Sequence, residues 1–446
     1  MFVSTFDLYR IGPGPSSVHT VGPMRAARRF VHALEADGAF FQTSRIHVDL
    51  YGSVACTGRD QGTDSAIIAG LSGDTPETAD PALLASRAAR ASADGTLALA
   101  GRTRITFDPM ADLVFHVDKA FAYHSNALRF TARNGRGEAL ATRLFFSTGD
   151  GDVLTDGETA APGTVLRIPC GFATAVEMLA VGREQGKKAT DMVRANEQVL
   201  RSPGELLAHL TRTAAAMHEA IERGLATDGM LPGGLRRPRR AAAQAAALAG
   251  TDPSAAAWAA VYATAVAEEN AAGGRVVAAP SNGAAGPIAG VLELWRTTTP
   301  MADDNGAATF LLGAAAIGQL LRQNGIKHSG CQGEVGVAAA MAAAGLAAAG
   351  GATNDQLLFA AERALEPHLG MACDPVGGLV QDPCIARNAA AAAVAVQSAR
   401  LALRQPAPPR PTLDTMIRLL VESGREMAAR YKESSLGGIA VNVVDC

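Results

Sequence analysis

The chain has 446 residues, which is enough for two or three domains with extensive cores. Apolar residues make up 48% of the sequence and charged residues 19%, a balance that is typical of a folded globular protein and excludes a disordered one. The 40 Lys and Arg residues and the 43 Asp and Glu residues leave a net charge of −3, so charge gives no reason to expect a nucleic acid or a membrane surface as partner.

Residues 1–155 predict an α+β domain. Helical spacing of apolar residues runs over 22–36 and returns over 62–71. The segment 45–55 alternates apolar and polar side chains as a strand does, and 75–101 is predicted as a helical insert. Four shorter segments between turns are also predicted as strands: 104–107, 112–117, 127–132 and 142–147.

Residues 156–200 are expected to form a connection, and residues 201–446 an all-α C-terminal domain. Alanine-rich runs alternate there with short breaks that contain Gly and Pro, such as 280–283 and 373–378. Alanine lets helices pack closely, and glycine lets the backbone approach a ligand.

Nothing in the sequence predicts secretion or a membrane span. The first residues lack the basic and apolar regions of a signal peptide, so we expect a cytoplasmic protein. The segment 335–354 has no charged residue and is long enough to cross a bilayer. Its small side chains and lack of aromatic residues favour a buried helix.

The six cysteines are Cys56, Cys170, Cys331, Cys373, Cys384 and Cys446. In a reducing compartment, clustered cysteines favour metal binding or catalysis over disulfides. Cys331, Cys373 and Cys384 lie at breaks between predicted helices, where their side chains can turn toward a shared centre. Because no Cys-x-x-Cys pair is present, the spacing leaves two interpretations open, a metal site and small buried side chains.

Polar residues in three turns are candidates for binding or catalysis. Ser16, Ser17 and His19 lie in a loop rich in glycine and hydroxyl groups before a predicted helix. This setting suits anion binding at a helix N-terminus as well as ordinary capping. His124 lies in a predicted turn, and Ser281 can bind a substrate or form a tight turn.

Together, these motifs resemble those of the iron–sulfur-dependent bacterial L-serine dehydratases in their single-chain form. The resemblance runs from Phe6 to the C-terminus, and its blocks keep the family's order. The blocks are FDLYRIGPGPSSVHTVGPM at 6–24, LYGS at 50–53, LPGGL at 231–235, EENAAGGRVV at 268–277, APSNGA at 279–284, GCQGEVGV at 330–337, residues 373–388, and YKESSLGG at 431–438.

The resemblance implies an N-terminal domain similar to the serine-binding regulatory domain of phosphoglycerate dehydrogenases and a helical domain that holds a [4Fe–4S] cluster. Cys331, Cys373 and Cys384 match the three cluster cysteines, and the fourth iron is left open for substrate. Cys446 fits a C-terminal cysteine that folds back onto that iron in some family members. The implied reaction dehydrates and deaminates L-serine to pyruvate and ammonia, with the open iron as Lewis acid.

The sequence departs from the family at an expected catalytic residue. The family has a histidine, proposed as the base, where this chain has Gln61, and an amide cannot accept a proton at useful pH. We therefore predict His19 and His124 as catalytic residues together with Gln61, and His328 is a further candidate for the base. The predicted substrate-binding residues are Ser16, Ser17, Ser281, Asn282 and Gly283.

Two other functions stay open at this point. The change at Gln61 and the altered stretch before Cys331 are also compatible with a lyase for another β-hydroxy or β-substituted amino acid. A catalytically silent cluster protein that binds an amino acid is the third possibility. In every case we expect a small-molecule amino acid as partner, no nucleic acid and no membrane. We also expect a homodimer, because homo-oligomers are common among soluble proteins.

Overall fold

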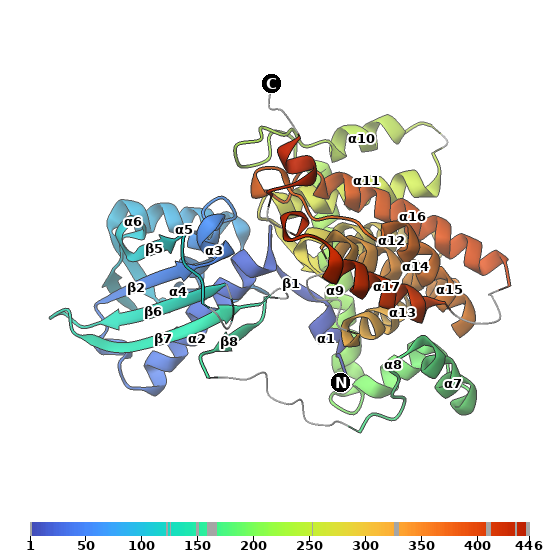
Figure 1. Cartoon of the computed structure of the whole chain (residues 1–446), viewed down its shortest axis with the longest axis horizontal. Coiled ribbons are helices and arrows are strands. Elements are labelled where there is room, and N and C mark those ends of the chain that lie inside the picture. The colour runs from blue at the N-terminus through green and yellow to red at the C-terminus, as the bar shows by residue number, and fades with distance from the viewer. Residues whose placement is uncertain are drawn as a thin grey trace. The chain divides into compact units, whose positions relative to one another are not determined.

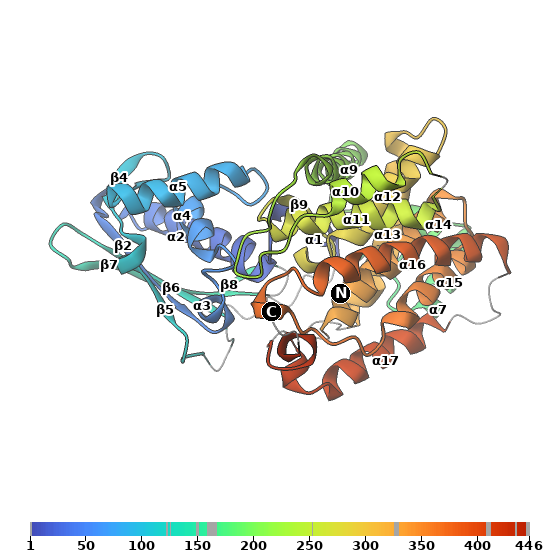
Figure 2. The ribbon, with the colours of Figure 1, turned by 90° about the horizontal axis from the view of Figure 1, so that it is seen from above.

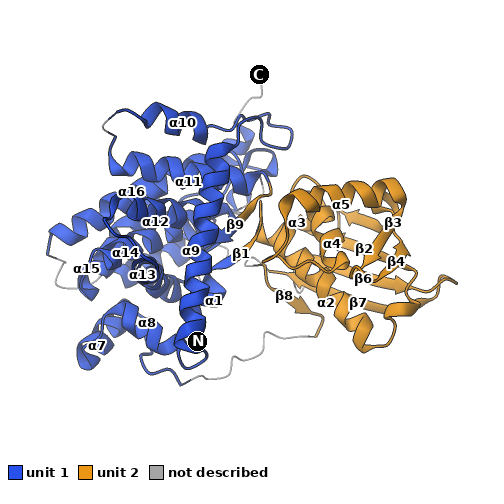
Figure 3. Ribbon diagram, turned by 180° about the vertical axis from the view of Figure 1, so that it is seen from behind, with its two compact units in different colours: residues 1–10, 164–272, 276–446 blue, residues 11–163, 273–275 orange. Residues whose placement is uncertain are grey.

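The computed structural model of the chain is seen from two directions in Figure 1 and Figure 2. It describes residues 2–121, 124, 126–148, 151–157, 167–251, 253–324, 330–406, 412–432 and 435–442. The chain forms two compact units (Figure 3). The α+β unit comprises Ile11–Gly163 and Gly273–Arg275, and the helical unit comprises Met1–Arg10, Thr164–Ala272 and Val276–Cys446. The predicted fold class, an α+β region followed by a mostly helical one, is confirmed.

The α+β unit is built on a mixed sheet. Among the described residues, seven strands pair in the order β3-β4-β2-β6-β7-β8, and β5 also pairs with β2. β2 runs parallel to β5, with Val48 opposite Leu113, and antiparallel to β6, with Val48 opposite Phe130. The strands are β2 Arg45–Tyr51, β3 Thr96–Leu99, β4 Thr103–Thr106, β5 Leu113–His116, β6 Ala127–Arg133, β7 Ala139–Ser147 and β8 Val153–Thr155.

Two helices, α2 (Gly22–Ala36) and α4 (Thr63–Ser72), cover one face of this sheet. The alternating apolar residues of β2 and β6 are buried beneath them, and the rings of Phe30 and Phe130 stack with centroids 5.3 Å apart. A Cβ added to Gly70 of α4 would lie 2.3 Å from the carbonyl oxygen of Met24 in α2. The close approach of the two helices therefore depends on glycine. Three further α-helices are described in this unit: α3 Ser53–Cys56, α5 Pro81–Asp94 and α6 Pro109–Asp112.

A second sheet is small and joins distant parts of the sequence. It pairs β1 (Arg10–Pro13) with β9 (Arg275–Ala278). The N–H of Gly14 also donates to the carbonyl of Gly274 at 2.9 Å. These bonds explain why Gly273–Arg275 groups with the α+β unit.

The helices of the second unit pack closely because small residues lie where they touch. Helices α11, α12, α14 and α16 lie side by side in both Figure 1 and Figure 2. A Cβ on Gly224 of α9 would lie 2.4 Å from the carbonyl oxygen of Ala265 in α11, so only glycine fits there. The helices are α1 Thr5–Leu8, α7 Ala175–Gln185, α8 Ala189–Glu197, α9 Pro203–Ala226, α10 Ala241–Leu248, α11 Ala255–Ala271, α12 Gly286–Thr298, α13 Asp304–Gln323, α14 Val337–Ala349, α15 Asn354–Leu365, α16 Cys384–Arg404 and α17 Leu413–Glu426.

Helix α14 is central to this unit. Among the described helices, the window Gln332–Ala349 alone is long and apolar enough to cross a membrane, and 78% of it is buried inside the structure. Its residues from Val337 to Gly345 are all buried against α13, α15 and α16. This is the environment of a core helix, as the composition of 335–354 predicts.

The first ten residues belong to the helical unit, although the sequence places them in the N-terminal domain. The hydroxyl of Ser4 donates to Glu197 of α8 at 2.9 Å, and the backbone N–H of Thr5 donates to the same carboxylate. The Tyr9 hydroxyl donates to the carbonyl of Leu311 in α13 at 2.6 Å. The carboxylate of Glu197 thus satisfies donors at the N-terminus of α1 and fixes the segment on the helices.

Segment 75–101 is not a single helical insert. It contains α5 and then β3, because Gly95 has a left-handed backbone (φ 61°) that ends the helix. Thr96 then begins the antiparallel pairing with Thr106 of β4. The alanine-rich pattern conceals this change of structure.

Residues 156–200 are also more than a connection, because they contain α7 and α8. The hydroxyl of Thr174 accepts the N–H of Glu177 and starts α7, which buries Met178 and Leu179. The sequence-based expectation missed these helices because each is short and only part of its surface is apolar.

Candidate functional site

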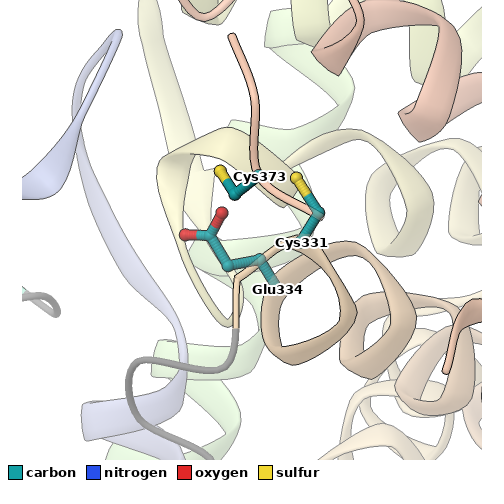
Figure 4. Close-up of side chains that lie close together, drawn as sticks. All are labelled: Cys331, Glu334 and Cys373. Carbon is teal, nitrogen blue, oxygen red and sulfur yellow. The ribbon is translucent and has the colours of Figure 1, made fainter. Parts of the chain in front are cut away.

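Two cysteines and a carboxylate converge in the helical unit. Cys331 precedes a π-helical turn, Gln332–Gly336, that leads into α14, and Glu334 lies within this turn. Cys373 lies on the segment before α16, where its N–H donates to the carbonyl of Tyr431 at 2.8 Å. The two sulfurs and a Glu334 oxygen all lie within 4.8 Å of one another, and Figure 4 shows the carboxylate turned toward the sulfurs. π-Helical turns of this kind are frequent at functional sites.

Cys384 is the first residue of α16 and belongs to the same cluster electrostatically. Burial raises the pKa of its thiol, and the negative charges of Cys331 and Glu334 raise that pKa further. All three cysteines are nearly inaccessible, with exposed fractions of 2% for Cys331, 6% for Cys373 and 8% for Cys384. The structure thus groups Cys331 and Cys373 with Glu334, and Cys384 is near enough for the charges of Cys331 and Glu334 to raise its pKa.

Arg387, one turn after Cys384, supplies positive charge to this cluster. Its Nη1 donates to the Sγ of Cys331 at 3.3 Å and to the carbonyl of Ala372 at 2.8 Å. Its Nη2 donates to Asp374 at 2.9 Å. A cation that donates to a sulfur stabilises the thiolate, which is the form that binds metals.

The donor set fits a metal centre built from soft ligands. Two sulfurs and a carboxylate oxygen lie within 4.8 Å of one another in a buried region, and the charges of Cys331 and Glu334 raise the pKa of the Cys384 thiol. Cysteine thiolates hold zinc, copper(I) and iron–sulfur clusters, whereas hard cations prefer oxygen ligands. The residues present are thus compatible with each of these groups, an iron–sulfur cluster among them.

The predicted substrate loop lies beside the same carboxylate. A Cβ on Gly283 would lie 3.4 Å from Oε2 of Glu334. The loop is fixed by its own polar contacts, because Asn282 donates to Asn270 of α11 at 3.0 Å and Asn388 of α16 donates to the carbonyl of Gly283 at 2.8 Å. Ser281, Asn282 and Gly283 are therefore held next to the cysteine cluster.

The C-terminal segment is attached to the residues that follow Cys373. The N–H of Ile439 donates to Asp374 at 2.7 Å, and the hydroxyl of Ser435 donates to the carbonyl of Pro375 at 2.6 Å. Cys446, predicted as a further metal ligand, lies outside the described residues. The described part of the segment ends at residue 442.

A second polar cluster, in the α+β unit, surrounds His19. This residue lies in a π-helical turn, Ser17–Val21, that leads into α2. The ring Nε2 lies 3.2 Å from the carbonyl of Ser53, which can only accept, so Nε2 carries the proton. Nδ1 is then an acceptor, and it lies 3.0 Å from the hydroxyl of Ser16. Ser17 begins the turn and is buried.

Burial lowers the pKa of His19 to about 4, although its contact with the Ser53 carbonyl raises it slightly. The imidazole is therefore neutral at pH 7. A neutral ring with a defined acceptor nitrogen can receive a proton. The same environment that makes the ring neutral also makes it a weak base.

Gln61 belongs to the same cluster as His19. Its Nε2 donates to the hydroxyl of Thr57 at 3.1 Å, and that hydroxyl lies 3.1 Å from Nε2 of His19. The hydroxyl of Thr63 donates to the backbone carbonyl of His19 at 2.8 Å. The contact with Thr57 orients the imidazole, and the bond from Thr63 fixes the backbone of His19.

His124 is linked to this cluster through Asn126. Its Nδ1 accepts the N–H of Asn126 at 3.2 Å, and the Asn126 side chain accepts from the N–H of Ser53 at 2.9 Å. Among the described contacts, none joins His124 directly to His19. His328, the further candidate for the base, lies outside the described residues.

The predicted residues thus form two groups in different units. The α+β unit holds Ser16, Ser17, His19, Gln61 and His124, and the helical unit holds the cysteines and the Ser281 loop. Sequence reasoning missed Glu334 and Arg387. The one available signal was their spacing, because each follows a predicted ligand cysteine by three residues. In a helix, this spacing places each residue on the same side as its own cysteine.

Comparison with known proteins covers most of the chain. The family model described as "Serine dehydratase alpha chain" matches residues 184–440, and the model described as "Serine dehydratase beta chain" matches residues 4–158. An L-serine dehydratase from Streptomyces coelicolor is 42% identical over 457 residues, and L-serine dehydratase 2 from Escherichia coli K12 is 42% identical over 458 residues. Both comparisons cover the whole of each chain. An L-serine dehydratase from Haemophilus influenzae is 39% identical over 99% of each chain.

Proposed function

Since this chain belongs to the serine dehydratase family, with the alpha-chain and beta-chain regions in one polypeptide, we propose that it is an L-serine ammonia-lyase that uses a [4Fe–4S] cluster held by Cys331, Cys373 and Cys384. The products are pyruvate and ammonia. The supporting observation is the convergence of the buried Cys331 and Cys373 with Glu334, together with the buried Cys384, whose pKa is raised by the charges of Cys331 and Glu334.

The surroundings of these sulfurs suit the proposed cofactor. When bound, the cluster supplies an iron with an open position that acts as a Lewis acid on the hydroxyl of serine. Arg387 stabilises the charge on the Cys331 sulfur, and its ion pair with Asp374 holds the guanidinium in place. The low exposure of all three cysteines excludes water from the sulfurs.

Binding of the substrate is assigned to the loop that carries Ser281 and Gly283. Asn282 acts by holding this loop on Asn270, as their 3.0 Å hydrogen bond indicates. A rigid loop keeps the substrate in one orientation, and orientation is a large part of catalysis.

Proton transfer is assigned to the cluster around His19. The Ser16 hydroxyl donates to Nδ1 of His19, so a proton can pass from this hydroxyl to the ring. Ser17 begins the same turn and is the second hydroxyl assigned to substrate binding. Gln61 has a positioning role, because it holds Thr57 against the ring. His124 is the alternative acceptor.

Cys446 is proposed to cover the open iron in the resting enzyme. The attachment of Ile439 and Ser435 to Asp374 and Pro375 supports this, because it holds the C-terminal segment next to Cys373. We further propose that the enzyme is a cytoplasmic homodimer that acts on free L-serine, and light scattering of the assembled protein measures its oligomeric state.

The decisive experiment compares two buried cysteines. The protein is reconstituted anaerobically with iron and sulfide, and pyruvate formation from L-serine is measured with iron content and visible absorbance. We expect Cys384→Ala to lose the cluster and the activity. Cys170→Ala is the matched control, because Cys170 is also buried but its sulfur contacts Gln185 and not the residues of the cysteine cluster. Full activity of Cys384→Ala, or an assembled wild-type cluster that yields no pyruvate, would contradict the proposal.

A further inference from the structure

A short hairpin of the helical unit has no role in the proposed function, although it contains the LPGGL block. It comprises residues 229–239, and we call it the 229–239 hairpin. The N–H of Leu231 donates to the carbonyl of Arg237 at 2.8 Å. The N–H of Arg239 donates to the carbonyl of Gly229, also at 2.8 Å. These two bonds join the two sides of the hairpin.

The base of the hairpin is fixed on α11 by two carboxylates. Glu269 accepts from Arg239 at 2.8 Å, and the side chains of this ion pair are only 7% and 8% exposed. Glu268 accepts the backbone N–H of Arg240 at 2.7 Å and that of Ala241 at 3.2 Å. Because α11 packs against α9, α12 and α16, the hairpin starts from a rigid support.

The far side of the hairpin contacts the turn that precedes Cys384. Gln381, which is 2% exposed, donates through its Nε2 to the carbonyl of Pro232 at 2.6 Å. Arg237 forms an ion pair with Asp382, and both side chains are 32% exposed. The hairpin thus holds two successive residues of this turn.

Cys384 takes its position from the same turn. It is the first residue of α16, and the N–H of Ile385 donates to the carbonyl of Gln381 at 2.8 Å. The carbonyl of Asp382 accepts the N–H of Val376 at 2.9 Å, which closes the segment before the helix into a loop. A displacement of Gln381 or Asp382 would therefore displace the start of α16 and its cysteine.

We infer that the 229–239 hairpin holds Cys384 in place for the cofactor, and that Arg237 and Gln381 are positioning residues that act through the turn before it. This inference rests on the proposed function, because it takes Cys384 as a ligand of the cluster. A metal centre needs its ligand atoms at defined positions, and the residues behind the ligands supply that support.

The first test measures how fast the anaerobically assembled enzyme releases iron to an excess of chelator, followed by its visible absorbance. Arg237→Met removes the ion pair with Asp382, and we expect iron release to become about three- to tenfold faster. Arg237→Lys keeps the charge and should stay within about twofold of the wild type. Arg236→Met is the matched control, because Arg236 is exposed and forms no hydrogen bond or ion pair with any described residue.

A second pair of variants tests the contact of Gln381. Gln381→Met removes the donor to Pro232 and keeps the length of the side chain, so we expect iron release about two- to tenfold faster. Gln319→Met is the control, because Gln319 is 1% exposed and its Nε2 also donates to a backbone carbonyl, that of Val3, at 2.7 Å. Both substitutions remove one buried hydrogen bond from the helical unit, so a difference in iron release reports on Cys384 and not on stability alone.

Hydrogen exchange on the cluster-free protein gives a result that does not depend on the cofactor. The N–H of Val376 is protected by its bond to the Asp382 carbonyl. We expect this amide to exchange at least about threefold faster in Arg237→Met than in Arg236→Met, because the loop loses its contact with the hairpin.

The outcomes separate this inference from the proposed function. Iron release or exchange that is the same in Arg237→Met and Arg236→Met would overturn the inference, and so would equal iron release from Gln381→Met and Gln319→Met. If the wild type forms pyruvate while these results are obtained, the proposed function stands and the role of the hairpin alone fails. An assembled wild-type cluster without pyruvate would overturn the proposed activity, whereas faster iron release confined to Arg237→Met and Gln381→Met would still support the hairpin's role.

Discussion

Arg387 offers a test of how the cysteine cluster is stabilised. Replacing it with methionine keeps most of the side-chain length and removes the charge and all donors. The variant loses the hydrogen bonds to Cys331 and Ala372 and leaves Asp374 without its cation. We expect the free energy of unfolding of the helical unit to fall.

The size of the effect follows from burial. The side chain of Asp374 is 4% exposed and that of Arg387 is 17% exposed, so this is a buried ion pair. Removing one partner of such a pair costs about 3–5 kcal/mol, because the other charge remains buried. The carboxylate of Asp374 keeps the N–H of Ile439 as a partner, which places the expected loss near the lower end, at about 3 kcal/mol.

Tryptophan fluorescence measures this loss in the helical unit alone. Both tryptophans of the chain, Trp258 in α11 and Trp295 in α12, belong to that unit. Urea unfolding is followed on the reduced, cluster-free protein, so that metal binding adds nothing to stability. Arg363→Met is the matched control. Its ion pair with Glu366 is about half exposed on both sides, and such pairs contribute about 0–1 kcal/mol.

A double variant shows whether the charge is the cause. Asp374→Asn alone is expected to destabilise the unit, and Arg387→Met with Asp374→Asn is expected to cost less than the sum of the two single changes. A loss below about 1 kcal/mol for Arg387→Met, or strict additivity in the double variant, would refute the reasoning.

Three further predictions concern the histidines and Gln61. His19→Asn should lower kcat by about 10²–10⁴-fold with iron content unchanged, because it removes the nitrogen that accepts the Ser16 proton. A decrease in kcat of less than about tenfold would favour His124 as the base. Gln61→His should preserve or raise serine turnover, since a ring nitrogen can also donate to Thr57, and a clear loss would mean that the cluster depends on the amide. Burial lowers the pKa of His209 to about 4 in the folded chain, below its unfolded value of about 6.5. The neutral imidazole therefore contributes fully to the free energy of unfolding above about pH 6.5, and this contribution is lost as the pH falls to about 4. His209→Phe, which can keep the stacking on Phe6, should remove up to about 3 kcal/mol of that pH dependence in urea titrations, and an unchanged profile would contradict this.

Local patterns predicted individual elements well. Helix α2 has the bounds that its apolar spacing predicts, because its buried residues Phe30, Val31 and Leu34 follow the helical period. The prediction treated α5 and β3 as one helical segment, because alanine residues continue past the end of the helix. The helix ends at Gly95, whose left-handed backbone the composition does not reveal. α1 could not be assigned to its unit, since its partner Glu197 is far away in sequence.

The candidate site depended on long-range packing that spacing does not encode. Cys331 and Cys373 are separated by α14 and α15, so their approach is set by how those helices fold back. Resemblance to a known family supplied the ligand set, and the residues alone left it open. Glu334 and Arg387 look like ordinary polar helix residues in the sequence, and only their contacts with the sulfurs and the Ser281 loop distinguish them.

The position of α1 has a consequence for dividing the chain. Residues 1–10 pack on the helical unit through Glu197 and Leu311, whereas the residues that follow form the α+β unit. A protease cut between residues 157 and 167 would therefore yield an N-terminal fragment that still carries a piece of the other unit. The two fragments should stay associated after cleavage, and separately expressed fragments should recombine. Deleting residues 2–9 from the N-terminal fragment should weaken that association, because only the pairing of β1 with β9 and the bond from Gly14 to Gly274 would then join the fragments among the described contacts.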